Sequence, residues 1–218
     1  MTDAATHSAT HDAATHGTTH YAAYYKSVDV STLAFEPLAK ENKLYVARLA
    51  APLLVQTPPV QLATSVDPEV PFVYVRPAGQ FREFLAGVEA WVLDTCLQKK
   101  EEWLRKDVDD DALRHNFKSF FKGDDFKLKV GPELAVFDAA KDPAGAEEAE
   151  EGRHVRCVLE LSRVCFGRQE FGAMWRLVQA QLVEVPPCLI DDAADDGEPE
   201  DGSEVASETS DDPDGEFV

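Results

Sequence analysis

The sequence predicts a mainly β fold, a small barrel that carries a helical insertion and lies between two tails. Three observations lead to this prediction. Apolar and polar side chains alternate on both sides of a turn-like FGRQEFG segment within residues 153–185, as in half-buried strands. Residues 80–97 place their apolar side chains on one helical stripe. Residues 1–27 and 188–218 are too poor in apolar side chains to order themselves, so we expect both to be disordered.

The predicted closing hairpin spans residues 153–185. Apolar side chains alternate along its first strand at Val155, Cys157, Leu159 and Leu161, and alternation resumes at Trp175 in the second strand. Five arginines and three acidic residues give this stretch a charge of +2, although the whole chain carries −20. The acidic residues are therefore concentrated elsewhere.

The chain before this hairpin supplies the remaining strands. We expect a short lead-in strand around Phe35, then strands at 44–49 and 53–57, the latter ended by Pro58-Pro59. Further strands are expected at 60–64, 72–75, 126–130 and 134–137, and an acidic loop at 139–152.

Two helices are expected between the early and late strands. The first, 80–97, continues to about Leu104, and its stripe includes Phe81, Leu85 and Trp91. The second spans 112–121 behind an N-cap offered by the aspartates at 109–111.

Seven or eight strands with a helical insertion predict an OB-fold-like Greek-key barrel, a fold that binds oligonucleotides on one face. An eight-stranded sandwich is the alternative. The expected organisation is a His/Thr/Ala-rich tail at 1–27, one domain at 28–187 and an acidic tail at 188–218.

Charge and cysteine content limit the function classes. Thirteen acidic residues and no Lys or Arg lie in 191–218, and 139–152 adds −4, so the remaining body carries only about −3. No secretory signal and no apolar run of about 18 residues is present. Cys157 and Cys165 lie among apolar strand residues and are interpreted as buried reduced thiols in an intracellular protein.

Catalytic motifs are absent: the sequence has no P-loop, GxSxG, HExxH or Gly-rich dinucleotide loop. The aspartates at 109–111 and 124–125 could hold Mg²⁺ in a nuclease, but a helix cap and a turn are favoured for them. The Thr-His repeat at 7–20 could hold a metal on one helical face, but a disordered tail is favoured. We therefore expect no enzyme activity, metal or cofactor.

Cations interleaved with aromatic rings are typical of single-stranded nucleic acid binding, where cations follow phosphates and rings stack on bases. One such set lies in 112–130, which carries +3: Arg114, Lys118, Lys122, Lys127 and Lys129. A second set lies on the closing hairpin: Arg163, Phe166, Arg168, Trp175 and Arg176. A third set is Phe72, Tyr74 and Arg76. Trp175 is the first choice for a stacking platform, Trp103 is the second, and Trp91 is expected in the core.

The acidic tail offers a partner site. It is polyanionic beside a body with basic patches, and its acidic run is followed by an apolar pair, so it can combine steering charge with an anchor. The expected partner-binding residues are Asp211, Asp212, Asp214, Glu216 and Phe217. A solubilising tail is the simpler interpretation.

Residues 33–185 resemble the single-stranded DNA-binding proteins of nucleocytoplasmic large DNA viruses, the iridovirus, phycodnavirus and mimivirus type related in fold to that of short-tailed phages. LLVQTPPV (53–60) and WRLVQ (175–179) carry the resemblance most specifically, together with FREFLAGVEAWVLD and FKLKV. It implies an OB-fold, non-sequence-specific single-stranded DNA binding and no catalysis. It also implies replication partners, a polymerase or helicase-primase, docked by the acidic tail around Phe217. The implied location is the host nucleus or a cytoplasmic viral replication site.

One hypothesis of a different class remains open. An acidic interaction protein, either histone-chaperone-like or a virion structural component, would bind basic proteins through 139–152 and 191–218. A homodimer is a further partner state that the sequence leaves open, and no membrane contact is expected.

Overall fold

Five strands close into a barrel at the centre of the protein. The computed structural model describes residues 22–42, 44–67, 69–104 and 108–184. The barrel strands are β4 (Val60–Leu62), β5 (Phe72–Arg76), β7 (Asp125–Phe137), β9 (His154–Phe166) and β10 (Phe171–Val183). Around the barrel the order is β4-β5-β7-β10-β9, and β9 pairs back with β4. β7 and β10 run parallel, whereas the other neighbours run antiparallel. This closed five-stranded arrangement confirms the predicted OB-like barrel.

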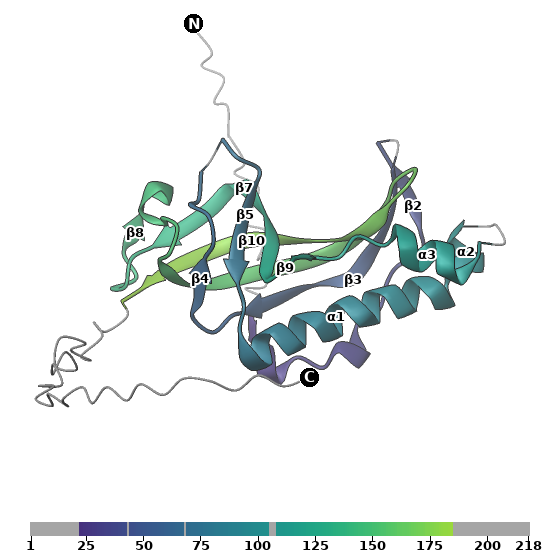
Figure 1. Cartoon of the computed structure of the whole chain (residues 1–218), viewed down its shortest axis with the longest axis horizontal. Helices are drawn as coiled ribbons and strands as arrows, with labels where there is room; N and C mark the ends of the chain where they lie inside the picture. The colour runs from purple at the N-terminus through teal and green to yellow at the C-terminus, as the bar shows by residue number, and fades with distance from the viewer. Residues whose placement is uncertain (1–21, 43, 68, 105–107, 185–218) are drawn as a thin grey trace, which may run out of the picture. The chain divides into compact units, whose positions relative to one another are not determined.

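Other strands of the described chain extend or border the barrel (Figure 1). They are β1 (Ala23–Tyr24), β2 (Ala39–Glu41), β3 (Leu44–Gln56), β6 (Phe121–Lys122) and β8 (Pro143–Ala144). β3 pairs with the second half of β9, and β4 pairs with the first residues of β9. β9 is therefore shared by β3 and β4 on one edge and by β10 on the other.

Thr57 marks the point where the chain passes from β3 to β4. Its side chain is buried, and its hydroxyl accepts a hydrogen bond from the Cys157 backbone N–H at 2.9 Å and donates one to the Pro58 carbonyl at 2.7 Å. Pro58 and Pro59 cannot donate to a strand ladder. The threonine hydroxyl thus satisfies a β9 amide at the break, which confirms that the prolines end the strand.

The core lies inside the barrel and follows the predicted alternation. In β9, Val155, Cys157, Leu159 and Leu161 are buried, while Arg156 is exposed between them. β10 contributes a matching set of inward side chains, Trp175, Leu177, Ala180 and Leu182. The closing hairpin is confirmed as one antiparallel pair.

The helical insertion joins β5 to β7. α1 (Gly79–Gln98) buries the stripe Phe81, Leu85, Val88, Val92 and Cys96, and α2 (Lys100–Leu104) follows it. α3 (Asp110–Asn116) begins behind Asp109, whose carboxylate accepts the Ala112 N–H as the N-cap. The two helical regions and the cap are confirmed, although α3 ends before the expected Phe121, because 121–122 pair with β7 as β6.

Three expectations need correction. The stretches 44–49 and 53–57 form one strand with a register irregularity between Arg48 and Leu53, and 126–137 is also one strand. The lead-in strand is reduced to an isolated bridge between Phe35 and Leu49.

The fold also includes segments that the sequence predicts to be a disordered tail or a loop. Tyr25 is buried against Phe81 and Phe84, with ring centroids 5.1 and 5.8 Å apart, so residues 22–27 belong to the fold. They include β1 and a 3₁₀ turn (Tyr25–Ser27), and a second turn follows at Val30–Thr32. The acidic loop contains β8 and a third turn (Ala146–Glu148), and it buries Ala149, whose carbonyl accepts the Val66 N–H.

Candidate nucleic-acid interface

The outward surface of β5, β7 and β10 carries the strongest candidate site. Val73 and Val75 of β5 point into the core, so Phe72 and Tyr74 point outward, where both are half-buried. The register places Lys129 opposite Phe72 and Lys127 opposite Tyr74, and Arg176 of β10 lies opposite Lys129. We call this set of five side chains the basic face: Phe72, Tyr74, Lys127, Lys129 and Arg176.

Each aromatic ring of the basic face has a lysine ammonium near it. Lys127 Nζ lies 3.7 Å from the Phe72 ring centroid, and Lys122 Nζ lies 5.9 Å from that of Tyr74. A cation within about 6 Å of a ring is attracted by the ring quadrupole. The two rings and their lysines therefore combine an apolar surface with positive charge at the same place.

A groove of about 490 Å³ lies beside these residues. Its cationic lining consists of Lys118, Lys127 and Lys129, and Phe72, Met174 and Cys165 add apolar surface. The loop between β9 and β10 closes one side through Gly167 and Glu170. In an OB-fold, the face of the second and third barrel strands and the loop between the fourth and fifth bind oligonucleotides, and β5, β7 and the β9–β10 loop take these positions.

Some cationic side chains of this surface form ion pairs with carboxylates, and others do not. Arg176 is paired with Glu160, Lys118 Nζ lies 3.0 Å from Glu170, and Arg76 Nε lies 3.1 Å from Asp125. Lys127 and Lys129 have no carboxylate within ion-pair distance in the described part of the chain. These two lysines are the cations most available to an anion.

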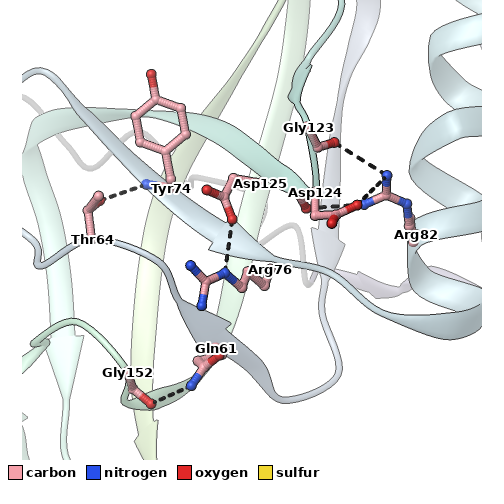
Figure 2. A network of polar contacts seen from close by, with 9 residues as sticks. All are labelled: Gln61, Thr64, Tyr74, Arg76, Arg82, Gly123, Asp124, Asp125 and Gly152. Carbon is pink, nitrogen blue, oxygen red and sulfur yellow. Dashed lines mark hydrogen bonds and ion pairs between the residues drawn. The ribbon is translucent and has the colours of Figure 1, made fainter.

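Figure 2 shows the polar network around Tyr74 and Arg76. Arg76 Nε donates a hydrogen bond to the Asp125 carboxylate. Arg82 of α1 donates to the backbone carbonyl of Asp124 at 3.1 Å and lies 3.2 Å from the Asp124 carboxylate. The Tyr74 ring stands clear of these contacts, and its backbone N–H donates to Thr64 Oγ at 3.0 Å. Asp124 lies in the turn between β6 and β7, as the turn interpretation predicted, whereas Asp125 is the first residue of β7.

The structure corrects the choice of stacking residues on the hairpin. Trp175 is 1% exposed, and its ring lies 6.0 Å from Phe126 between the barrel strands, so it forms the floor of the groove instead of a platform. Phe166 is buried and stacks on Phe171, and Trp103 is buried against both Phe35 and Phe166. Trp91, expected in the core, is only half-buried and stacks on Phe35.

The remaining predicted nucleic-acid-binding residues do not line the groove. Arg168 is exposed in the β9–β10 loop, Lys122 is exposed on β6, and Arg163 lies on the outward side of β9. Arg114 is exposed on α3 and does not line the groove. The partner-binding residues of the tail, Asp211, Asp212, Asp214, Glu216 and Phe217, lie outside the described residues.

Sequence reasoning missed some groove residues and undervalued Phe72. Met174 and Leu44 are exposed apolar residues that line the groove, and neither lies in a pattern that marks it for binding. Phe72 was named in the third predicted set, and alternation would have strengthened that choice, because Val73 and Val75 occupy the inward positions of the same strand.

The three cysteines in the described residues lie in or beside the core. Burial raises the pKa of Cys96 and of Cys157 to about 12, so both are neutral thiols at pH 7. Burial also raises the pKa of the half-buried Cys165. The residues that the structure describes contain no group of three or more His, Cys, Asp or Glu arranged to hold a metal, and none of their helices is long and apolar enough to cross a membrane.

Comparison with known proteins places this OB-like barrel in a family. The chain belongs to the family of unknown function DUF5871, whose sequence profile matches residues 79–195. No curated protein gives a significant match.

Solved structures with a similar fold include those of one phage protein. The single-stranded DNA-binding protein from bacteriophage Enc34 aligns with a TM-score of 0.39 and 11% identity over 74% of this chain and 99% of that chain. Its C-terminal truncation gives 0.40 and 10% over 72% and 98%, and its complex with ssDNA gives 0.39 and 8% over 70% and 96%. Scores below 0.5 are low, so the function proposed below is based on the surface of this chain.

Proposed function

We propose that this protein binds single-stranded DNA without sequence specificity along the basic face and the adjoining groove. The observation that carries the proposal is the pairing of two accessible rings with lysines on the barrel face formed by β5 and β7. Phe72 and Tyr74 are outward and half-buried, and Lys127 and Lys129 lie opposite them in register. The rings would stack on bases, and the two lysines would hold phosphates.

This arrangement favours single strands over a duplex. A stacking ring needs an unpaired base whose face is free, and each such contact is worth about 1–3 kcal/mol. The bases of a duplex are stacked on each other, so a duplex offers only its phosphates to this surface. The proposed binding is non-covalent and uses no catalytic group of the chain.

The biological setting is part of the same proposal. The resemblance to the proteins of nucleocytoplasmic large DNA viruses supports protection of single strands during viral DNA replication, recombination or repair, in the host nucleus or at a cytoplasmic replication site. The acidic tail would recruit replication proteins through Asp211, Asp212, Asp214, Glu216 and Phe217, since its thirteen acidic residues supply steering charge and Phe217 an anchor.

Fluorescence anisotropy with oligo-dT and with a duplex of equal length tests the binding mode. The intact chain should prefer oligo-dT. Phe72→Ala/Tyr74→Ala should weaken binding about thirty-fold if each ring contributes only about 1 kcal/mol. Tyr24→Ala/Tyr45→Ala is the matched control, because both tyrosines are exposed and neither lines the groove.

The salt dependence tests the lysines separately. Lys127→Gln/Lys129→Gln should lower the slope of log K against log salt by about 1.4, since each phosphate contact on a single strand contributes about 0.7. Equal binding of duplex and oligo-dT, or an aromatic double variant that retains the affinity of the intact chain, would contradict the proposal. Basic-protein binding that depends on 191–218, without oligo-dT binding, would instead support an acidic interaction protein.

A further inference from the structure

Two arginines outside the basic face share one carboxylate. Arg48 of β3 lies directly opposite Arg163 of β9 in the antiparallel register. Glu41 of β2 accepts hydrogen bonds from Arg48 Nε at 2.8 Å and Arg48 Nη2 at 2.7 Å, and it lies 3.9 Å from Arg163 Nη1. All three side chains are partly exposed to solvent.

Arg48 and Arg163 are stabilised by an anion placed between their guanidinium groups, and Glu41 supplies this anion. Like charges directly opposite each other in an antiparallel pair are destabilising. The hydrogen bond from Arg48 holds the pKa of Glu41 below its ordinary value, and Glu41 raises the pKa of Arg48. The carboxylate takes both hydrogen bonds of the Arg48 fork, a geometry that matches carboxylate and phosphate equally well.

The trio lies on the same side of the sheet as the groove. Residues directly opposite each other in register share a face, so Glu41 shares one with Leu44, and Arg48 shares one with Arg163. Cys165 lies two residues after Arg163 on the same side of β9, and both Cys165 and Leu44 line the groove. A strand leaving the groove past these residues would next meet the two arginines.

We propose that Arg48 and Arg163 form a phosphodiester-binding subsite that continues the groove, and that Glu41 occupies this subsite in the absence of nucleic acid. The inference rests on the proposed function, which supplies the polyanion. A backbone phosphate would replace the Glu41 carboxylate on the same guanidinium donors. β2 is three residues long and pairs only with β3 in the part of the chain that the structure describes, so few backbone contacts hold the strand that carries Glu41.

The first test measures oligo-dT affinity at low salt. Glu41→Gln should bind about two- to five-fold more tightly than the intact chain, since it removes the competing charge of an exposed ion pair. Glu83→Gln is the matched control, because Glu83 is an exposed carboxylate on α1 with no ion pair among the described residues. Arg48→Gln/Arg163→Gln should lower the salt slope by about 0.7, one phosphate contact.

The second test uses inorganic pyrophosphate and needs no DNA. The Arg48 Nε–H resonance of Glu41→Gln should shift on titration, and the same resonance of the intact chain should shift less. If pyrophosphate shifts the Arg48 Nε–H resonance of neither protein, the proposed subsite is refuted, irrespective of the affinity for oligo-dT. Equal oligo-dT affinities of Glu41→Gln and Glu83→Gln, with an unchanged salt slope in the arginine double variant, would also overturn it. If the intact chain does not bind oligo-dT but pyrophosphate shifts the Arg48 resonance, the proposed function is refuted and the anion subsite is retained.

Discussion

Replacement of Trp175 by alanine separates a core role from a binding role. The ring is 1% exposed, lies opposite Leu161 in register and meets Phe120 and Phe126 at centroid distances of 6.4 and 6.0 Å. Removing a buried tryptophan costs about 3–5 kcal/mol, from a total stability of about 5–15 kcal/mol for a domain. We expect Trp175→Ala to lose much of its free energy of unfolding.

Urea unfolding followed by far-ultraviolet circular dichroism measures this loss without relying on tryptophan emission. Trp175→Phe should lose less, because it keeps a ring and removes the Nε1–H, which has no hydrogen-bond partner in the described part of the chain. Phe72→Ala should show the opposite behaviour, with weaker oligo-dT binding and a stability change of about 1 kcal/mol. If Trp175→Ala unfolds at the urea concentration of the intact chain but loses oligo-dT binding tenfold, the core assignment is refuted.

Three further predictions concern other parts of the chain. Thr57→Val should lower the free energy of unfolding by about 1–3 kcal/mol, because it leaves the buried Cys157 N–H unpaired, whereas Thr32→Val at the surface should change it by less than about 0.5 kcal/mol in the same urea titration. In a Cys188→Ser background at pH 8, Cys165 should react with a thiol reagent faster than Cys96 and Cys157, whose pKa near 12 leaves almost no thiolate, and oligo-dT should slow that reaction because Cys165 lines the groove; an unprotected Cys165 would place the DNA elsewhere. Truncation after Ile190 should raise oligo-dT affinity most at low salt, by removing thirteen competing acidic residues, and an affinity ratio independent of salt would exclude that competition.

Local sequence patterns predicted the long strands and the helices, but they missed the short strands β1, β2, β6 and β8 and could not show which strands pair. The alternation of Val155, Cys157, Leu159 and Leu161 predicted β9, because successive side chains of a strand point to opposite faces of the sheet. The junction at Thr57 was visible as a strand end, but nothing local shows that the strands on both sides of it pair with β9.

The candidate site was predicted in part for the same reason. Trp175 is in phase with the buried Leu177, so alternation alone would have placed it inward, and the neighbouring Arg176 favoured the wrong choice. Tyr74, Lys127 and Lys129 were selected by residue type and lie together, because the register of β5 and β7 joins them. The shared carboxylate of Arg48 and Arg163 could not be predicted, since it depends on three strands and their registers.

The position of β9 also sets an order of events during synthesis. β3 and β4 both need β9 as a partner, yet about a hundred residues separate Val60 from Val155, its partner across the closing pair. Contacts between segments so distant in the chain form late, because loop closure must precede them. Until β9 and β10 have left the ribosome, the apolar strands made first have unpaired edges and are prone to aggregate. The barrel of this protein therefore cannot close before β9 and β10 have been synthesised, and until then the early strands are the segments most prone to aggregate.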